Sequence, residues 1–289
     1  MNKRKGIILA GGSGTRLYPM TLATSKQLLN VYDKPMIYYP LSTLMLADIQ
    51  DICIITSPQD SNLFKKLLGN GDRFGINLTY IDQPSPDGLA QAYILAEEFL
   101  SNSPSAMILG DNIFYGSDFE KLLIKISKNA NDGTILSYEI KDPTRYGVVE
   151  VDDNGIATSI EEKPKIPKSN FAVTGLYFLD ENAPAYAKTI SPSQRGELEI
   201  TSLLEIYLKK FNLSVEFLER GNAWLDTGTF SSLNDAANLI KTLQTRQGIQ
   251  IGCLEEIAYK KQWITNIELE ASIDKHSNSD YGKYLMKLI

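Results

Sequence analysis

A glycine-rich segment near the start of the chain carries residue types suited to holding a polyphosphate. An apolar run over 6–10, typical of a buried strand, leads directly into it. The segment consists of Gly11, Gly12, Ser13, Gly14, Thr15 and Arg16. Glycines let backbone N–H groups approach phosphate oxygens without a Cβ in the way, and Arg16 adds a forked donor for an oxyanion. Lys26 supplies a second cation nearby in the sequence.

The spacing of these glycines matches neither of the two better-known phosphate motifs. A P-loop requires a lysine directly after its last glycine, and none follows Gly12 or Gly14. A Rossmann fingerprint requires a third glycine three residues after Gly14, where Leu17 stands. Taken alone, the segment therefore fits a phosphate site and an ordinary tight turn equally well.

Two aspartates stand at the predicted carboxyl ends of strands, where ligands bind in open parallel sheets. Asp111 follows the apolar run 106–109 and Gly110, and Asp226 follows Trp224-Leu225 and precedes a Thr-Gly-Thr turn. Two carboxylates together with substrate phosphates are a usual way to hold Mg²⁺. Each aspartate alone could equally be a turn residue or a helix cap.

Two polar segments further along allow both a functional and an ordinary interpretation. Glu161-Glu162-Lys163-Pro164 ends a predicted hairpin, where Pro164 would hold Lys163 more firmly than a loop tip; solvated charge is the ordinary interpretation. The segment 83–88, Gln-Pro-Ser-Pro-Asp-Gly, follows another strand. It is either a plain connector or a rigid loop whose Gln83 amide reads the edge of a nucleobase.

The elements that must position these groups alternate between strand and helix in the first half of the chain. Apolar runs predict strands at 6–10, 52–56, 78–81 and 106–109, and periodic runs predict helices at 35–47, 60–68 (ending at Gly69) and 89–100. Ser117 and Glu120 predict a capping box at the start of a further helix. This alternation favours a parallel sheet covered on both faces.

The middle of the chain predicts antiparallel or mixed strands. They are expected at 133–140, 146–151, 155–162 and 171–179, with a hairpin turn at Asp153-Asn154-Gly155. A helix at 201–211 and a strand at 214–218 follow. Beyond Gly228 the pattern is helical at 230–247, at 255–263 and from Tyr281, and the polar stretch 274–280 is expected to be loose.

Composition limits the chemistry available to the 289 residues. The net charge of −6, without a basic stretch, argues against a nucleic-acid groove, and the apolar stretches are too short to predict a membrane span. Cys53 and Cys253 are expected to be buried thiols in a reducing, cytoplasmic setting. A single histidine, His276, excludes a His-rich zinc site and makes a catalytic triad improbable. The chemistry must depend on carboxylates, Lys, Arg and a hard metal ion.

Eight segments follow one another along essentially the whole chain and carry a family resemblance. They are Leu-Ala-Gly-Gly-Ser-Gly-Thr-Arg-Leu (9–17), Ser-Lys-Gln-Leu-Leu (25–29), Gln-Pro-Ser-Pro-Asp-Gly-Leu-Ala-Gln-Ala (83–92), Leu-Gly-Asp-Asn-Ile-Phe-Tyr-Gly (109–116), Tyr-Gly-Val-Val (146–149), Glu-Glu-Lys-Pro (161–164), Arg-Gly-Glu-Leu-Glu-Ile-Thr (195–201) and Trp-Leu-Asp-Thr-Gly-Thr (224–229). Together they closely resemble the glucose-1-phosphate thymidylyltransferase family.

The resemblance implies an enzyme that makes dTDP-glucose and pyrophosphate from dTTP and glucose 1-phosphate with Mg²⁺, the entry step to dTDP-rhamnose and related deoxysugars. It implies an α/β fold with a mostly parallel, Rossmann-like nucleotidyltransferase sheet, an antiparallel sugar-binding insert and C-terminal helices. The catalytic domain would cover 1–229, with a nucleotide half at about 1–115 and a sugar-binding half at about 116–229. Residues 230–289 would form a helical oligomerisation or regulatory region.

The resemblance also assigns roles to residues. Those implied to bind the nucleotide are Leu9, Gly11, Gly12, Ser13, Gly14, Thr15, Gln27, Gln83, Pro86 and Gly88, with Gln83 and Gly88 on thymine. Those implied to line the sugar pocket are Asn112, Tyr146, Gly147, Glu162 and Val173, with Glu162 accepting bonds from sugar hydroxyls. Asp111 and Asp226 would hold Mg²⁺, and Arg16, Lys26 and Lys163 would be catalytic.

The resemblance further implies a homotetramer and feedback by a downstream dTDP-sugar at a second nucleotide site, although the C-terminal helices could equally be a lid over the monomer. The sequence departs locally from the family pattern at Asn30, Ser202, Leu204, Asn222, Phe230 and Leu254, and none of these is a proposed catalytic group. Three rival functions remain open at this point. They are a sugar-phosphate nucleotidyltransferase that uses UTP, CTP or ATP, a metal-dependent glycosyltransferase, and a catalytically silent nucleotide sensor.

Overall fold

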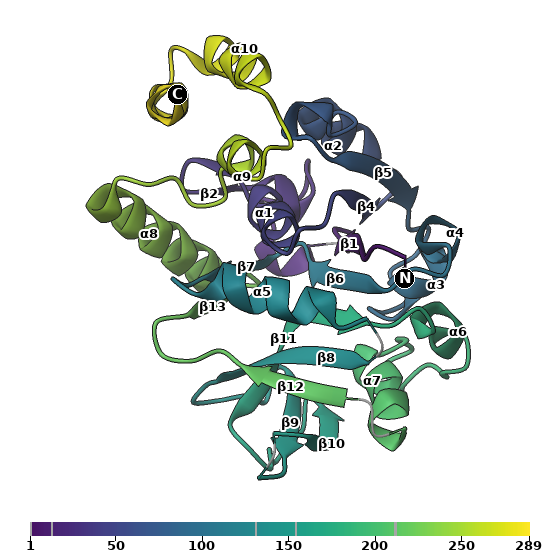
Figure 1. The fold of residues 1–289 in the computed structure, drawn as a ribbon. Coiled ribbons are helices and arrows are strands. Elements are labelled where there is room, and N and C mark those ends of the chain that lie inside the picture. Colours follow the sequence, from purple (N-terminus) through teal and green to yellow (C-terminus); the bar gives the residue numbers. More distant parts are fainter. Residues whose placement is uncertain (1, 13, 131, 154, 211–212) are drawn as a thin grey trace.

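The computed structural model describes residues 2–12, 14–130, 132–153, 155–210 and 213–289. A nine-stranded sheet forms its centre, in the order β10-β9-β11-β6-β1-β4-β5, with β8 joined to β11 and β12 joined to β8 (Figure 1). These strands are β1 Lys5–Leu9, β4 Asp51–Thr56, β5 Asn77–Asp82, β6 Ser105–Leu109, β8 Gly133–Glu139, β9 Gly147–Val151, β10 Ala157–Glu162, β11 Phe171–Leu179 and β12 Leu213–Phe217.

The first half of the chain forms the parallel part of the sheet, as predicted. β1 pairs in parallel with β4 and β6, and β4 pairs in parallel with β5. Alternate side chains of β1 enter two separate cores because successive residues of a strand face opposite sides of the sheet. Ile8 packs with one group of helices and Ile7 with another, and both isoleucines are fully buried.

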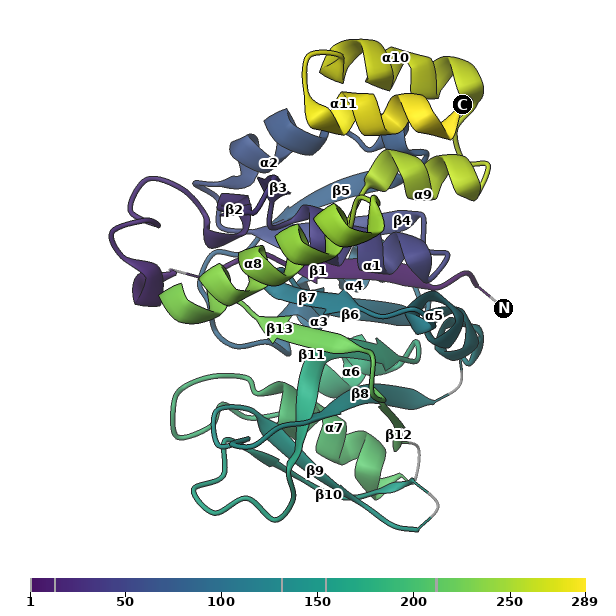
Figure 2. The same ribbon diagram turned by 90° about the vertical axis from the view of Figure 1, so that its left-hand side faces the viewer.

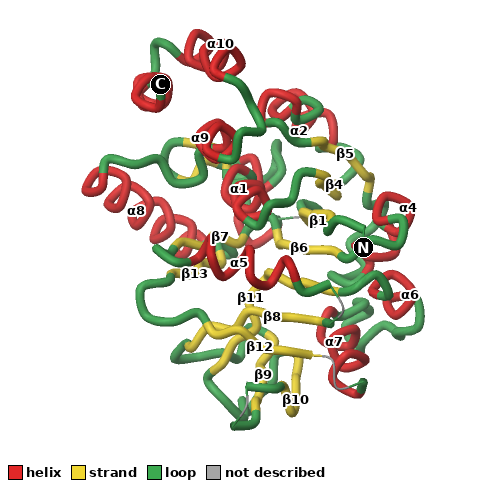
Figure 3. The backbone as a smooth tube through the Cα atoms, in the orientation of Figure 1, coloured by secondary structure: helices red, strands yellow, loops and turns green. Residues whose placement is uncertain are grey.

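Helices cover both faces of this sheet, which confirms the second part of the prediction (Figure 3). On the face of Ile8 lie α1 Tyr38–Leu46, α2 Ser61–Leu68, α5 Phe119–Lys128 and α9 Leu254–Lys260. On the face of Ile7 lie α3 Gln91–Leu95, α4 Glu97–Leu100, α6 Ala183–Ala187 and α7 Ile200–Lys209.

The middle of the chain forms the mixed part of the sheet, as expected. β11 runs antiparallel to β6, β8 and β9, β10 runs antiparallel to β9, and β12 runs parallel to β8. Figure 2 shows β9 and β10 at the end of the molecule opposite the last helices. The predicted turn joins β9 to β10, although Asn154 itself lies outside the described residues.

A separate two-stranded ladder carries one of the two candidate metal ligands. β7 Asn112–Tyr115 pairs antiparallel with β13 Ala223–Asp226, which places Asp226 opposite Asn112. The expectation that Asp226 ends a strand of the parallel sheet is therefore wrong. The chain leaves β6 through Gly110 and Asp111 and enters β7 at once, so the ladder starts beside the carboxyl end of β6.

The helical end of the chain is more ordered than the sequence predicted. α8 Phe230–Gln247 has the predicted bounds, and α9 is followed by α10 Asn266–His276 and α11 Asp280–Leu285. The polar stretch expected to be loose is thus largely helical. A capping box between Thr265 and Glu268 begins α10, and burial of Leu269 and Ile273, four residues apart, holds it against its neighbours.

Three local predictions are wrong in detail. No side-chain hydrogen bond caps α5, which begins after Asp118 rather than in a Ser117–Glu120 capping box. The helix expected at 89–100 divides at Ala96 into α3 and α4. Pro35, expected in a helix, lies in a short ladder of β2 Asn30–Val31 and β3 Lys34–Pro35, and α1 begins at Tyr38.

Cys53 and Cys253 are free and buried, as expected. Within the described ranges, no helix is both long and apolar enough to cross a lipid bilayer.

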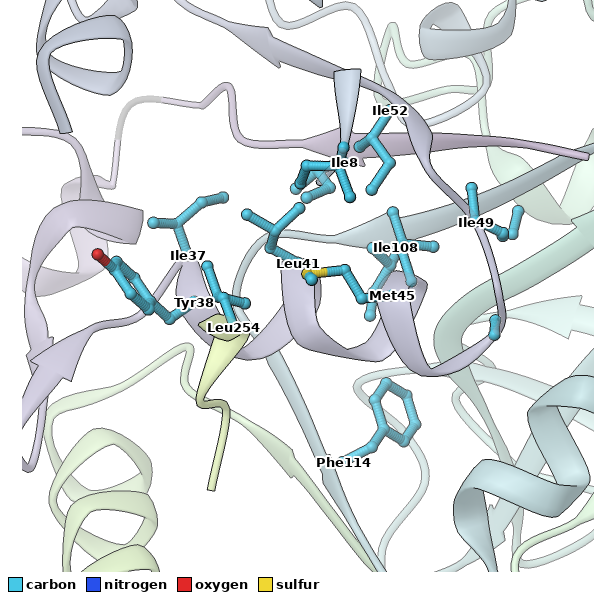
Figure 4. Close-up of a cluster of buried hydrophobic side chains, with 14 of the residues drawn as sticks. Ile8, Ile37, Tyr38, Leu41, Met45, Ile49, Ile52, Ile108, Phe114 and Leu254 are labelled. Carbon is cyan, nitrogen blue, oxygen red and sulfur yellow. The ribbon is translucent and has the colours of Figure 1, made fainter. Parts of the chain in front are cut away.

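The C-terminal helices are anchored to the catalytic sheet through α9. Leu254 of α9 lies beside Tyr38 and Leu41 of α1 in the core, and its side chain is fully buried (Figure 4). This leucine is one of the departures from the family pattern, and burial explains why an apolar residue is tolerated there.

We predict that Leu254→Ala lowers the free energy of unfolding by about 2–5 kcal/mol, because a buried leucine is lost and a cavity remains. Urea denaturation followed by circular dichroism measures the change. The matched control is Ile267→Ala, since Ile267 is 77% exposed, and it should change stability by less than about 0.5 kcal/mol. Equal effects of the two substitutions would contradict the role of α9 as an anchor.

Candidate active site

The glycine-rich loop leaves the carboxyl end of β1 and turns closely past a glutamine. A Cβ on Gly11 would lie only 2.0 Å from Oε1 of Gln83, so the close approach requires glycine here. Gly14 has φ +59° and begins a single turn over Thr15–Leu17. The Thr21 hydroxyl donates to the Gly14 carbonyl at 2.8 Å. Ser13, also predicted to bind the nucleotide, lies outside the described residues.

Lys26 and the two aspartates come together beside this loop. The Lys26 Nζ lies 2.6 Å from Oδ2 of Asp111, and the lysine side chain is only 11% exposed. Asp226 accepts a hydrogen bond from the Tyr146 hydroxyl at 3.2 Å and lies 3.8 Å from the Arg145 guanidinium. The convergence predicted for Lys26, Asp111 and Asp226 is therefore present.

A buried asparagine holds the two carboxylates in register. Asn112 Nδ2 donates to Asp111 Oδ1 at 2.9 Å, while Asn112 Oδ1 accepts from Trp224 Nε1 at 2.6 Å and from Gly175 N at 3.1 Å. The backbone carbonyl of Asp111 accepts from both the backbone N–H and the hydroxyl of Thr227. Asn112 also lines the inner hollow, so the prediction that it binds sugar stays a prediction beside this structural role.

The electrostatics of the pair follow from burial. Burial raises the pKa of Asp226 above its ordinary value, and the nearby carboxylate of Asp111 raises it further, while Lys26 and Arg145 act in the opposite direction. Burial, with Asp226 as the next largest cause, raises the pKa of Tyr146 to about 12, so its hydroxyl remains a donor at neutral pH. The site therefore gathers negative charge that its own cations only partly balance.

A hollow of about 190 Å³ opens next to the two aspartates. It is lined by Arg16, Leu89, Leu109, Asp111, Asn112, Arg145, Tyr146, Gly147, Glu162, Lys163, Val173, Gly175, Tyr177, Ile200, Thr201, Trp224 and Asp226. All five residues predicted for the sugar pocket are among them, together with Arg16 and Lys163. We call this space the inner hollow.

Within the inner hollow, Glu162 and Lys163 are held at the end of β10. Glu162 Oε2 accepts from the Thr201 hydroxyl at 3.2 Å, and Glu162 Oε1 lies 3.3 Å from Lys163 Nζ. The Lys163 backbone has φ +45°, a conformation that a side chain rarely adopts, and its N–H donates to the Tyr146 carbonyl. Strain of this kind is commonly retained at functional sites.

A larger hollow of about 490 Å³ lies on the other side of the glycine loop. Its lining includes the predicted nucleotide residues Gly12, Gln83 and Pro86, with Lys26 at its edge. We call it the outer hollow. The other described residues predicted to bind the nucleotide line neither hollow, namely Leu9, Gly11, Gly14, Thr15, Gln27 and Gly88. Leu9 and Gln27 are buried, with Gln27 packed under Gly110, and Gly88 packs against the backbone of Leu198.

Sequence reasoning missed three residues of the inner hollow near its acidic groups. They are Arg145, which lies beside Asp226, Thr201, which binds Glu162, and Trp224, which reaches Asp111 only through Asn112. A signal existed for each, since all three stand in or directly beside the segments quoted for the resemblance. His276 lies on α10 against the ring of Tyr281, and it does not line either hollow.

The donor set fits a hard divalent cation that retains other ligands. Among the described residues, no group of three or more His, Cys, Asp and Glu side chains is placed to hold a metal. Asp111 and Asp226 together offer carboxylate oxygens in a partly buried site with excess negative charge. Such a pair suits a cation whose remaining positions are filled by water and substrate oxygens.

Comparison with known proteins agrees with this geometry. The family model described as nucleotidyl transferase matches residues 5–242, so the fold and site are those of a nucleotidyltransferase. Glucose-1-phosphate thymidylyltransferases of Neisseria meningitidis and Xanthomonas campestris are 55% and 54% identical to the chain, and each alignment covers at least 98% of both partners. The chain belongs to the glucose-1-phosphate thymidylyltransferase family.

Solved structures support the same assignment. A Bacillus anthracis protein, provisionally described as a glucose-1-phosphate thymidylyltransferase and solved with sucrose, is 42% identical with a TM-score of 0.76, covering 82% of this chain and 94% of that one. A UDP-glucose pyrophosphorylase solved with UDP-glucose has a TM-score of 0.74 at 22% identity, covering 83% of this chain and 99% of that one. The second similarity shows the fold alone.

We predict that Asp226→Asn raises the melting temperature of the metal-free protein at pH 7, because it removes a buried charge next to Asp111. The raised pKa of Asp226 means that ionisation costs stability. This cost to folding stability is absent below pH 3.8, the ordinary pKa of the carboxyl group. It grows as the pH rises toward the raised pKa of Asp226 in the folded protein and is complete above that pKa. The difference between variant and wild type should therefore vanish in acid.

Thermal melting in EDTA across this pH range measures the effect. Adding MgCl₂ should stabilise the wild type more than the variant, because the variant lacks one carboxylate ligand. A variant that melts at or below the wild-type temperature in EDTA at pH 7 would contradict the electrostatic account.

Proposed function

We propose that the chain transfers a thymidylyl group from dTTP to glucose 1-phosphate, giving dTDP-glucose and pyrophosphate, with Mg²⁺ as the cofactor. The observation that carries this proposal is the meeting of Lys26, Asp111 and Asp226 between a glycine loop and a pocket that bears Glu162 and Lys163. Family membership supplies the choice of substrates.

The reaction requires charge control rather than proton transfer. An oxygen of the sugar phosphate attacks the α-phosphorus, the bond from that phosphorus to the bridging oxygen breaks, and pyrophosphate leaves. The attacking phosphate oxygen is already a nucleophile at neutral pH, so no general base is needed, in keeping with the position of His276 outside the cleft. Catalysis then depends on alignment and on positive charge near the phosphates.

We assign the nucleotide to the glycine loop and the outer hollow. The backbone of Gly11 to Thr15 would donate to the triphosphate, and Gln83 would contact thymine beside Gly11. Arg16, which lines the inner hollow, would stabilise the charge on the departing pyrophosphate. Pro86 would form part of the wall of this site. The wall would be supported from behind by Leu9, Gln27 and Gly88.

We assign glucose 1-phosphate to the inner hollow. Glu162 would accept hydrogen bonds from sugar hydroxyls, and Tyr146, Gly147 and Val173 would form the walls of the pocket. Lys163 would face the sugar phosphate and the α-phosphate. Arg145 would add a second cation there, because it lines the inner hollow, is half-exposed and lies next to Asp226.

Asp111 and Asp226 would hold Mg²⁺, which would supply positive charge to the reacting phosphates when bound. Lys26 would then balance Asp111 and stay close to the triphosphate. The two free, buried cysteines agree with the cytoplasmic location proposed for this enzyme.

We also infer an organisation in which residues 1–229 form the catalytic domain and 230–289 serve assembly and regulation, in a homotetramer with feedback by a dTDP-sugar. A third hollow, of about 260 Å³, lies between α1, the start of α5 and the segment that joins α8 to α9. It is separate from the cleft, and it is the place proposed for the feedback ligand.

The direct test is pyrophosphate release in the presence of dTTP, glucose 1-phosphate and MgCl₂, with each component omitted in turn. We expect release to require all three, together with formation of dTDP-glucose. Release of nucleoside diphosphate instead of pyrophosphate would contradict nucleotidyl transfer.

We predict that Arg16→Ala and Lys163→Ala fold normally but each reduce kcat by about 100- to 1000-fold, the usual cost of removing one preorganised donor. Steady-state kinetics with dTTP and glucose 1-phosphate measure this loss. Lys121→Ala is the matched control, since Lys121 is 84% exposed on α5 and outside both hollows. Wild-type turnover in either cleft variant would refute its assigned role.

We predict that UTP is a poorer but real substrate. Thymine differs from uracil by one methyl group, which costs at most about 1–3 kcal/mol, roughly 10- to 200-fold in kcat/KM. Purine triphosphates should fail because of their size. A product assay with dTTP, UTP and ATP under the same conditions makes the comparison, and a strong preference for ATP would reject the thymidylyl assignment.

A further inference from the structure

The amide of Gln83 is held in one orientation by a chain of hydrogen bonds that ends on a carboxylate. Gln83 Nε2 donates to Gln91 Oε1 at 2.7 Å, and Gln91 Nε2 donates to Asp87 Oδ2 at 2.8 Å. The Asp87 backbone N–H also donates to Gln91 Oε1, at 3.3 Å. The Ser85 hydroxyl donates to the same Asp87 oxygen at 2.5 Å.

The direction of this chain follows from chemistry, because a carboxylate only accepts hydrogen bonds. Asp87 therefore requires the NH₂ end of the Gln91 amide, and the carbonyl end of Gln91 must face Gln83. A carbonyl accepts, so Gln83 must turn its own NH₂ end toward Gln91. The carbonyl Oε1 of Gln83 is then left facing Gly11, at the place where a Cβ on that glycine would be 2.0 Å away.

The elements that carry this chain are firmly placed. Gln83 directly follows β5, where its backbone N–H donates to the Thr56 carbonyl at 2.7 Å, and its side chain is only 6% exposed. Gln91 is the first residue of α3. The intervening loop is tied to a distant segment, because Leu198 N donates to the Asp87 carbonyl and Ala90 N donates to the Leu198 carbonyl.

An amide with a fixed orientation distinguishes pyrimidines by the pattern on their hydrogen-bonding edge. Thymine and uracil present a donor, N3–H, next to a carbonyl acceptor, whereas cytosine presents an acceptor at N3 next to an amino donor. Gln83 offers a free carbonyl and one remaining N–H, which complement thymine or uracil. Recognition of cytosine would require the amide to turn by 180°, and the bond to Gln91 opposes that turn.

We propose that Gln91 is a positioning residue for nucleobase selection, which fixes the Gln83 amide so that the enzyme accepts thymine or uracil and rejects cytosine. This inference rests on the proposed function, since it takes Gln83 as the base-reading residue. Gln91 does not line the outer hollow and would act through Gln83 alone.

The test compares two substitutions of similar size in the full-length protein. Gln91→Leu removes both hydrogen-bonding ends, so the Gln83 amide can turn, and the ratio of kcat/KM for dTTP to that for dCTP should fall by about tenfold or more. Gln91→Glu combined with Asp87→Asn still accepts from Gln83 and keeps the bond to position 87 with its direction reversed, so this double variant should keep the wild-type ratio. Gln91→Ala replaces the leucine variant if the latter does not fold.

UTP provides a readout that general damage to the site would not mimic. UTP and dTTP share the same edge, so the ratio of kcat/KM for dTTP to that for UTP should stay unchanged in every variant. An unchanged dTTP-to-dCTP ratio in Gln91→Leu, or an equal loss in the double variant of Gln91→Glu with Asp87→Asn, would overturn the inference. Failure of the wild type to use dTTP or UTP would instead refute the proposed function.

Discussion

The proximity of two carboxylates in a partly buried cleft is the constraint on which the rest of this structure depends. Burial raises the pKa of Asp226, and the nearby carboxylate of Asp111 adds to the cost of ionising it. Within the protein the compensation is incomplete: Lys26 contacts Asp111 directly, while Arg145 lies 3.8 Å from Asp226. A bound ligand with positive charge would balance the excess negative charge of this cleft. A divalent cation would do so, because it prefers carboxylate oxygens as ligands.

The scaffold maintains this unfavourable arrangement with neutral groups. Asn112, buried between β7 and β13, contacts Asp111, Trp224 and Gly175, and Thr227 binds the Asp111 backbone. These bonds fix the positions of the two acids through the β7–β13 ladder. The same ladder lies against α8, so the helical end of the chain and the two candidate metal ligands share one support.

The sequence was most informative where a physical signal is local. Continuous apolar runs identified β1, β4 and β6 because strands buried on both faces have no polar side to display. A capping box at Thr229 begins α8, and Gly248 in a left-handed conformation ends it, which explains why both ends of this helix were predicted correctly. Arg16 and Asp111 also line one hollow, because β1 and β6 are neighbouring parallel strands whose carboxyl ends meet at one edge of the sheet.

Other features could not be predicted because they depend on partners distant in sequence. The β7–β13 ladder joins segments separated by more than one hundred residues, since Asn112 pairs with Asp226. For the same reason the hydrogen bonds of Asn112 to Trp224 and Gly175 could not be foreseen, and Arg145 was not recognised as a neighbour of Asp226. The helix α10 escaped notice because only a few apolar residues, such as Leu269 and Ile273, bury it in a polar stretch.

The central claim is that Asp111 and Asp226 form one cation site, and equilibrium binding of Mn²⁺ to the full-length protein in the presence of dTDP-glucose tests it most directly. Electron paramagnetic resonance of free Mn²⁺ would report the bound fraction. The account predicts one tight site per chain in the wild type, weakened at least about 100-fold by Asp111→Ala and equally by Asp226→Ala. Wild-type affinity in either variant, with the protein folded, would contradict it.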